Sequence, residues 1–175
     1  QKWDPAHRNR ILTAYLDLSR QVIGAGASIV VWPEAATPFF FEIDAGMAAQ
    51  IRRLAMEARA PFIIGTDQYE PGSSGQADRY YNSAVLLGVD GRTLSTYQKV
   101  QIVPFGEYVP LKSLLFFVGP LVDKVSDFSP GAGPTLLEGD GFKVSVAICY
   151  ESVYPWLSRA FARQGSQLLV NITND

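Results

Sequence analysis

Short apolar runs that alternate with amphipathic segments constrain the fold of this chain more than any other feature. Ser28–Trp32 and Phe62–Thr66 are rich in β-branched and aromatic residues, which is typical of strands buried on both faces. Each run follows a segment whose apolar residues recur with helical spacing, Pro5 to about Ile23 and Asp44–Arg59. Helices that alternate with buried strands predict an α/β fold.

A hairpin interrupts this alternation in the middle of the chain. Asn82–Leu87 and Thr93–Tyr97 read as two strands, and the Asp-Gly pair between them is a strong hairpin signal. Further strands are expected at Lys143–Ile148 and Leu168–Ile172, with a helix between them from Val153 to Phe161. Antiparallel and parallel connections in one chain predict mixed sheets.

Composition narrows the function classes. The 175 residues carry a net charge of -2 with acids and bases interspersed, which argues against a nucleic-acid partner. The single Cys and single His argue against an internal disulfide and a Cys/His metal site, and no cofactor is expected. No apolar run approaches the roughly 20 residues that span a bilayer. Because the chain opens and stops abruptly, we expect residues 1–175 to be a partial domain, incomplete at both ends, of a longer protein.

Cys149 lies where nucleophiles often lie, between an apolar strand and a helix. The N–H groups at a helix N-terminus would stabilise both a thiolate and a tetrahedral oxyanion. A buried structural cysteine is the competing interpretation, and taken alone this residue favours it.

Three charged residues also occupy positions suited to chemistry. Glu34 follows an apolar strand, at the end where ligands bind in α/β sheets, and its apolar neighbours suit a partly desolvated general base. Lys99 follows the hairpin, where a fixed ammonium could stabilise an oxyanion. Glu107 lies in a Pro- and Gly-rich loop. Taken alone, Glu34 is about equally compatible with a capping or surface role, and Lys99 is better explained as a solvated lysine at a strand end. Glu107 is either a carboxylate that supports the site or an exposed loop residue.

Glu34, Lys99 and Cys149 in this order resemble the Glu-Lys-Cys triad of the nitrilase superfamily of carbon–nitrogen hydrolases, whose fold is an αββα sandwich. Within it the chain is similar to the apolipoprotein N-acyltransferase family over its whole length. The matching segments are Lys2-Trp3-Asp4, Trp32-Pro33-Glu34, Val103 to Pro110, Ile148-Cys149-Tyr150-Glu151 and Asn171 to Asp175.

The resemblance implies a role for each matched residue. Glu34 would be the general base, Lys99 the oxyanion partner, Cys149 the acylated nucleophile and Glu107 a second carboxylate of the active site. The supporting residues that it implies are Trp3, Tyr150 and Glu151.

The resemblance also implies an activity. A phospholipid, expected to be phosphatidylethanolamine, would donate an acyl chain through a Cys thioester to the N-terminal amine of a diacylglyceryl-cysteine apolipoprotein. The enzyme would lie in the bacterial inner membrane with this domain on the periplasmic face. A soluble nitrilase-type amidase and a non-catalytic binding module with an inert Cys149 are the alternatives.

The long segment from Val100 to Pro134 is rich in Pro, Gly and aromatic residues, and such a loop in a compact domain is typically functional. It contains the contiguous apolar run Leu114–Val118. We expect Leu111–Val122 to touch lipid in the intact enzyme. Ordinary core packing is the competing account of this run.

Overall fold

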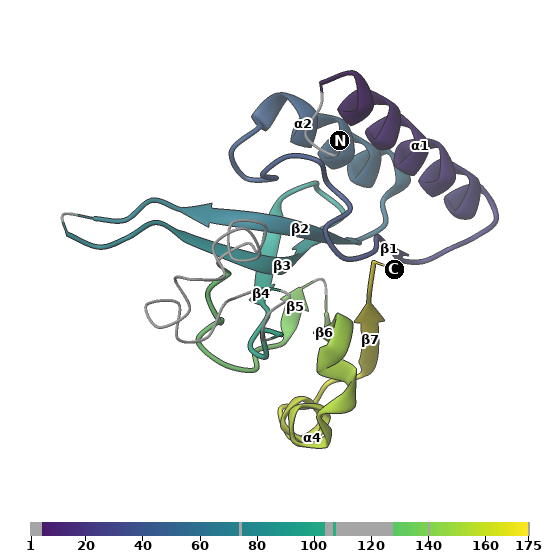
Figure 1. Cartoon of the computed structure of the whole chain (residues 1–175). Coiled ribbons are helices and arrows are strands. Elements are labelled where there is room, and N and C mark those ends of the chain that lie inside the picture. The colour runs from purple at the N-terminus through teal and green to yellow at the C-terminus, as the bar shows by residue number, and fades with distance from the viewer. Residues whose placement is uncertain (1–4, 74, 104–106, 108–127, 140, 175) are drawn as a thin grey trace.

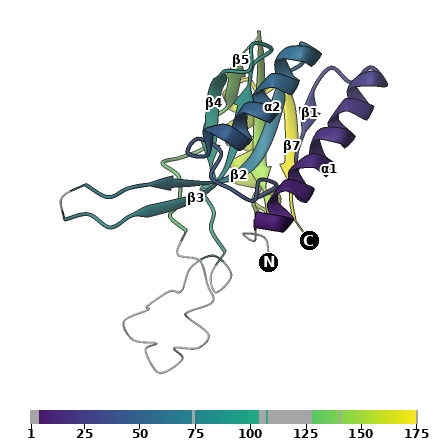
Figure 2. The ribbon, with the colours of Figure 1, turned by 90° about the horizontal axis from the view of Figure 1, so that it is seen from above.

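The computed structural model of the chain describes residues 5–73, 75–103, 107, 128–139 and 141–174 (Figures 1 and 2). The helices and strands are, in chain order, α1 (Pro5–Gly24), β1 (Val30–Val31), α2 (Ala45–Ala58), β2 (Phe62–Glu70), β3 (Arg79–Leu87), β4 (Thr93–Gln98), β5 (Leu137–Gly139), β6 (Phe142–Ile148), the 3-10 helix η2 (Cys149–Val153), α4 (Pro155–Arg163) and β7 (Leu168–Ile172).

The strands form two mixed sheets, as the sequence predicts. The first has the order β1-β2-β3-β4, with β1 parallel to β2 and the other pairs antiparallel. The second has the order β5-β6-β7, in which β6 pairs antiparallel with β5 and parallel with β7. The β3–β4 connection is the expected hairpin, and Gly91 in its turn has a φ of 73°.

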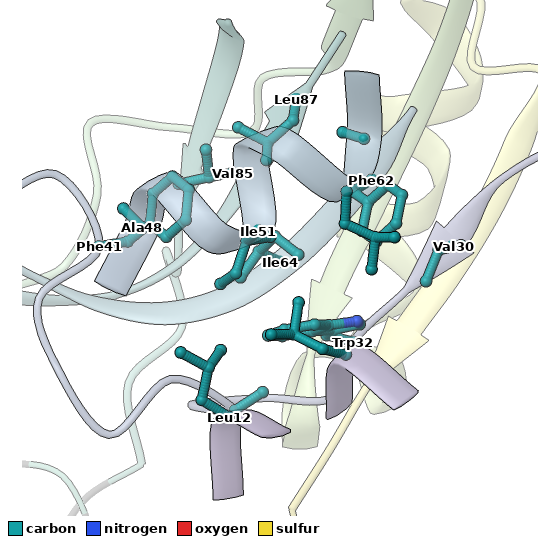
Figure 3. Packing of buried hydrophobic residues seen from close by; sticks show 14 of the residues in the cluster. Leu12, Val30, Trp32, Phe41, Ala48, Ile51, Phe62, Ile64, Val85 and Leu87 are labelled. Carbon is teal, nitrogen blue, oxygen red and sulfur yellow. The ribbon is translucent and has the colours of Figure 1, made fainter. Parts of the chain in front are cut away.

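The first sheet is buried on both faces because its side chains alternate between two clusters. Phe62 and Ile64 of β2 pack with Leu12 of α1 and Ile51 of α2 in one cluster (Figure 3). Ile63, between them in the strand, belongs to the other cluster. Each of these side chains is almost fully buried, which stabilises the fold by roughly 1.5–3 kcal/mol per side chain as an upper range.

The second cluster joins the two sheets. Ala84, Leu86 and Tyr97 of the first sheet pack with β5, β6 and β7. Phe161 of α4 also belongs to this cluster, with its ring edge-on to Tyr97 at 5.7 Å between centroids. The order of helices, first sheet and second sheet agrees with the expected sandwich.

The structure differs from the expected elements at several bounds. Only Val30–Val31 of the run Ser28–Trp32 forms a strand, since Pro33 has no N–H to continue the ladder. β2 and β3 both extend beyond the predicted strands into a long hairpin that projects from the body of the molecule in both views (Figures 1 and 2). Its cross-strand pair Tyr69 and Tyr80 has ring centroids 5.2 Å apart, which supports the pairing beyond the core.

Two further differences concern the second half of the chain. β5 falls in a part for which no strand was predicted, because its three residues are too few to show a pattern. The helix expected from Val153 begins at Pro155, and η2 precedes it. In the ranges that the structure describes, no helix has both the length and the apolar character needed to cross a membrane.

Candidate active site

Glu34 is held where β1 ends against the middle of β2. The N–H of Ala36 donates to the carbonyl of Gly65 at 2.9 Å, so the segment after Glu34 stays on the sheet. Gly65 permits this approach, because a Cβ there would lie 2.9 Å from the Cα of Glu34. Ala35 has a φ of 47°, a left-handed conformation that turns the chain directly after Glu34. The Glu34 side chain is largely buried.

Lys99 directly follows β4 and is only 1% exposed. Its backbone N–H donates to the carbonyl of Asn82 at 2.8 Å, so it lies opposite the start of the buried part of β3. Its Nζ lies 2.6 Å from Oε1 of Glu107 and 3.7 Å from Oε1 of Glu34. The ammonium ion is thus placed between two carboxylates, which offset the cost of burying its charge.

Glu107 is fixed by contacts on both sides of its own carboxylate. Its Oε1 accepts from Lys99, and its Oε2 accepts from the backbone N–H of Val103 at 2.8 Å. The N–H of Phe128 donates to the Glu107 carbonyl at 3.0 Å. These bonds bring two sections of the long segment Val100–Pro134 to the same cluster.

Asn82 belongs to this cluster, although sequence analysis missed it. Its Nδ2 donates to Oε1 of Glu34 at 2.5 Å and to Oε1 of Glu107 at 3.3 Å. The side chain is buried, with 4% exposure. The signal that could have found it is a polar residue at the start of an apolar strand. The expected hairpin pairs this residue with Lys99, which follows the next strand.

Cys149 directly follows β6 as the first residue of η2, and it is half-buried. Its φ of 54° is left-handed, which costs a non-glycine residue about 1–3 kcal/mol. Among the described non-glycine residues, a positive φ occurs only at Ala35, Arg59 and Cys149. Ala35 directly follows Glu34, and Cys149 is itself a predicted site residue. Backbone strain of this kind concentrates at functional sites.

Glu151 is fully buried and ties Cys149 to the segment that follows Lys99. It accepts from the N–H of Ile148 at 2.9 Å, just before Cys149. It also accepts from the N–H groups of Val100 and Gln101 at 2.8 and 3.0 Å, just after Lys99.

Tyr97 also contacts Glu151, because its hydroxyl donates a hydrogen bond to that carboxylate at 2.9 Å. Burial, followed by the charge of Glu151 and the hydrogen bond to it, raises the pKa of Tyr97 far above its ordinary value. Tyr97 therefore stays protonated as a hydrogen-bond donor at every physiological pH.

A second connection runs from Cys149 to Glu34 through β7. Ile148 of β6 pairs with Ile172 of β7, and the N–H of Asn174, just beyond β7, donates to Oε2 of Glu34 at 3.2 Å. Figure 1 shows the end of β7 beside β1. The structure thus brings the ammonium ion of Lys99 into contact with two carboxylates, and it connects Cys149 to them indirectly, through Glu151 and β7. A thiol, an ammonium ion and carboxylates are groups that acyl transfer or amide hydrolysis can use.

The remaining predicted residues are placed as follows. Tyr150 is 57% exposed, and its ring contacts that of Tyr154 edge-on, with 6.4 Å between centroids. Trp3 and the segment Leu111–Val122 lie outside the described residues. Within the described ranges, no group of three or more His, Cys, Asp or Glu residues is arranged to hold a metal ion.

The sequence pattern of the carbon-nitrogen hydrolase family matches residues 3–175. The chain belongs to this family. Comparison with solved structures agrees on the fold. The carbon-nitrogen hydrolase from Helicobacter pylori G27 has a TM-score of 0.69 at 20% identity, over 95% of this chain and 55% of that one. An amidase variant from Nesterenkonia sp. AN1 has a TM-score of 0.61 at 24% identity, over 97% and 61%. The predicted nitrilase-type fold is thereby confirmed.

Curated relatives within the carbon–nitrogen hydrolase family are more similar in sequence. The apolipoprotein N-acyltransferase of Geobacter metallireducens is 42% identical over 99% of this chain. Those of Pseudomonas aeruginosa and Methylococcus capsulatus are 37% and 34% identical over 99% and 100% of it. The chain spans about a third of the length of these relatives, since it covers 33% of each.

Proposed function

We propose that this chain is the catalytic part of an apolipoprotein N-acyltransferase. The observation that carries the proposal is 42% identity over 99% of the chain to a protein of that name. The largely buried cluster of Glu34, Lys99 and Glu107, connected to Cys149 through Glu151, supports it as the reacting centre.

In the first half-reaction Glu34 takes the proton of the Cys149 thiol, and Sγ attacks the ester carbonyl of a phospholipid. Phosphatidylethanolamine is the donor that we propose. Lys99 and nearby backbone N–H groups stabilise the oxyanion of the tetrahedral intermediate. The C–O bond then breaks, the lysophospholipid leaves with the proton from Glu34, and Cys149 carries a thioester.

In the second half-reaction the N-terminal amine of a diacylglyceryl-cysteine apolipoprotein attacks the thioester carbonyl. The C–N bond forms, the C–S bond breaks, and Glu34 accepts one proton from the amine nitrogen. That proton returns to the Cys149 thiolate, so the enzyme is regenerated and the product is an amide. Because the donor leaves before the acceptor reacts, ping-pong kinetics are expected.

We further propose that the chain is part of a longer protein of the bacterial inner membrane, with this domain on the periplasmic face. The relatives' length, about three times that of the chain, supports a longer protein. Contact of Leu111–Val122 with lipid belongs to the same proposal. A polarity-sensitive fluorophore at Phe116 should respond when the full-length protein is moved from detergent into a bilayer, and an unchanged signal would favour core packing.

The test uses the full-length protein incubated with phosphatidylethanolamine. The wild type should gain a hydroxylamine-labile acyl adduct on Cys149, and Cys149→Ala should lose both adduct and transfer. Glu34→Gln and Lys99→Ala should each slow acylation by about 100-fold or more. Lys143→Ala, which removes an exposed ammonium paired with Glu138, is the matched control and should acylate normally.

Two results would count against this function. Transfer by Cys149→Ala at the wild-type rate would exclude the thioester route. Rapid ammonia release from a small amide, without transfer to a lipopeptide amine, would favour the amidase alternative.

A further inference from the structure

Asn82 occupies a position at which the core between the two sheets changes from apolar to polar. It lies on the same face of β3 as Ala84 and Leu86, which pack against the second sheet. Lys99, directly after β4, lies opposite Asn82 and on the same face as Tyr97. Asn82 is therefore the last buried side chain of this β3 face before the charged cluster.

The contacts of Asn82 fix the orientation of its carboxamide. Nδ2 donates to two carboxylate oxygens, one of Glu34 and one of Glu107. Ionised carboxylates only accept hydrogen bonds, so the amide nitrogen must point toward them and Oδ1 must point in another direction. Within the part of the chain that the structure describes, this buried Oδ1 has no hydrogen-bond partner.

A buried acceptor without a partner lowers stability and calls for an explanation. Oδ1 lies roughly 2.3 Å from Nδ2 of the same amide. Nδ2 is 2.5 Å from Oε1 of Glu34, so Oδ1 lies within about 5 Å of that oxygen. One nitrogen about 2.9 Å from each oxygen can donate to both when it lies on the side of the two oxygens away from Nδ2.

We propose that Oδ1 of Asn82 accepts a hydrogen bond from the amine that attacks the acyl-enzyme, which makes Asn82 a catalytic residue of the second half-reaction. This inference rests on the proposed function. A neutral primary amine has two N–H groups and a lone pair. With one N–H on Glu34 and the other on Asn82, the lone pair is free to attack the thioester carbonyl.

The atoms balance without a proton change on Asn82. The amine nitrogen forms the C–N bond and the C–S bond breaks. The N–H directed at Glu34 gives up its proton to that carboxylate, and the N–H held by Asn82 remains in the amide product. The site should therefore prefer a primary amine, which has two N–H groups, over a secondary amine, which has one.

The first measurement isolates the second half-reaction in the full-length protein. Wild type and Asn82→Leu are acylated to completion with phosphatidylethanolamine, freed of donor, and mixed with a synthetic diacylglyceryl-cysteine peptide. Asn82→Leu should consume its thioester about tenfold or more slowly. The control is Ser83→Ala, because this buried hydroxyl on the opposite face of β3 bonds to Gln68, and it should transfer at the wild-type rate.

The second measurement separates this role from mere support of Glu34. The peptide is also offered with an N-methylated amine. Methylation should slow the wild type by about tenfold and leave the already slow Asn82→Leu rate nearly unchanged. A structural role predicts the same methylation effect in both proteins, and that result would overturn the inference.

The outcomes also separate this inference from the proposed function. Failure of the wild type to acquire a thioester would refute the proposed function. A wild type that acylates normally, beside an Asn82→Leu variant that transfers at the same rate, would refute the role of Asn82 alone. If Asn82→Leu does not fold, Asn82→Ser removes the carboxamide with less change in polarity, and the same two outcomes apply.

Discussion

Replacing Tyr97 by Phe should lower the stability of the protein near neutral pH but not at strongly alkaline pH. The Tyr97 side chain is fully buried, and its hydroxyl donates to both oxygens of Glu151, at 2.9 and 3.0 Å. A hydrogen bond to a charged group contributes about 1.5–3 kcal/mol. The wild type should exceed Tyr97→Phe in free energy of unfolding by about 2 kcal/mol at pH 8.

The pH dependence follows from the raised pKa of Tyr97, caused first by burial and then by the charge of Glu151 and the hydrogen bond to it. In the unfolded chain a tyrosine loses its proton near pH 10, whereas folded Tyr97 keeps its proton to higher pH. The contribution of Tyr97 to stability is therefore complete below about pH 10 and is lost as pH rises further. The loss is about 1.4 kcal/mol per pH unit, so the two proteins should be equally stable near pH 11.5.

Urea unfolding of both proteins at pH 8, 9.5, 10.5 and 11.5 measures this difference. Effects of other titrating groups cancel, because the two proteins share them. Tyr150→Phe, at an exposed tyrosine, is the control and should differ little from the wild type throughout. If the difference between wild type and Tyr97→Phe stays constant from pH 8 to 11.5, the buried Tyr97–Glu151 contact does not hold the tyrosine proton and the reasoning is wrong.

Two further substitutions test how the site is positioned. Gly65→Ala should reduce the rate of acyl transfer by about 100-fold, because its new Cβ would lie 2.9 Å from the Cα of Glu34 and displace that residue. Gly24→Ala is the control and should leave this rate unchanged, because a Cβ at Gly24 meets nothing within 4 Å. Lys99→Met should lower the free energy of unfolding by about 3–5 kcal/mol, because it removes the buried ammonium ion between the carboxylates of Glu34 and Glu107. Lys143→Met, in an exposed ion pair, should change it by less than about 1 kcal/mol in denaturant unfolding.

The sequence by itself determined the order and type of most elements, because those depend on local patterns. Helical periodicity gave α1 and α2, and apolar runs gave the buried parts of β2, β6 and β7 to within a few residues. The family was also predictable, since its motifs are contiguous in the chain, and the match over residues 3–175 confirms it. The assignment of Glu34, Lys99 and Cys149 as catalytic residues stays a prediction.

Only the tertiary structure decided how these residues meet. Nδ2 of Asn82 bonds to Glu34, 48 positions away in the chain, and Glu151 bonds to Val100 and Gln101. Neither contact leaves a local pattern, because each depends on which strands pair and in what register. The close approach of Gly65 to Glu34 is equally invisible in sequence, since a glycine within a strand has several meanings until the backbone beside it is known. Local patterns therefore specify the elements, and long-range packing specifies the site.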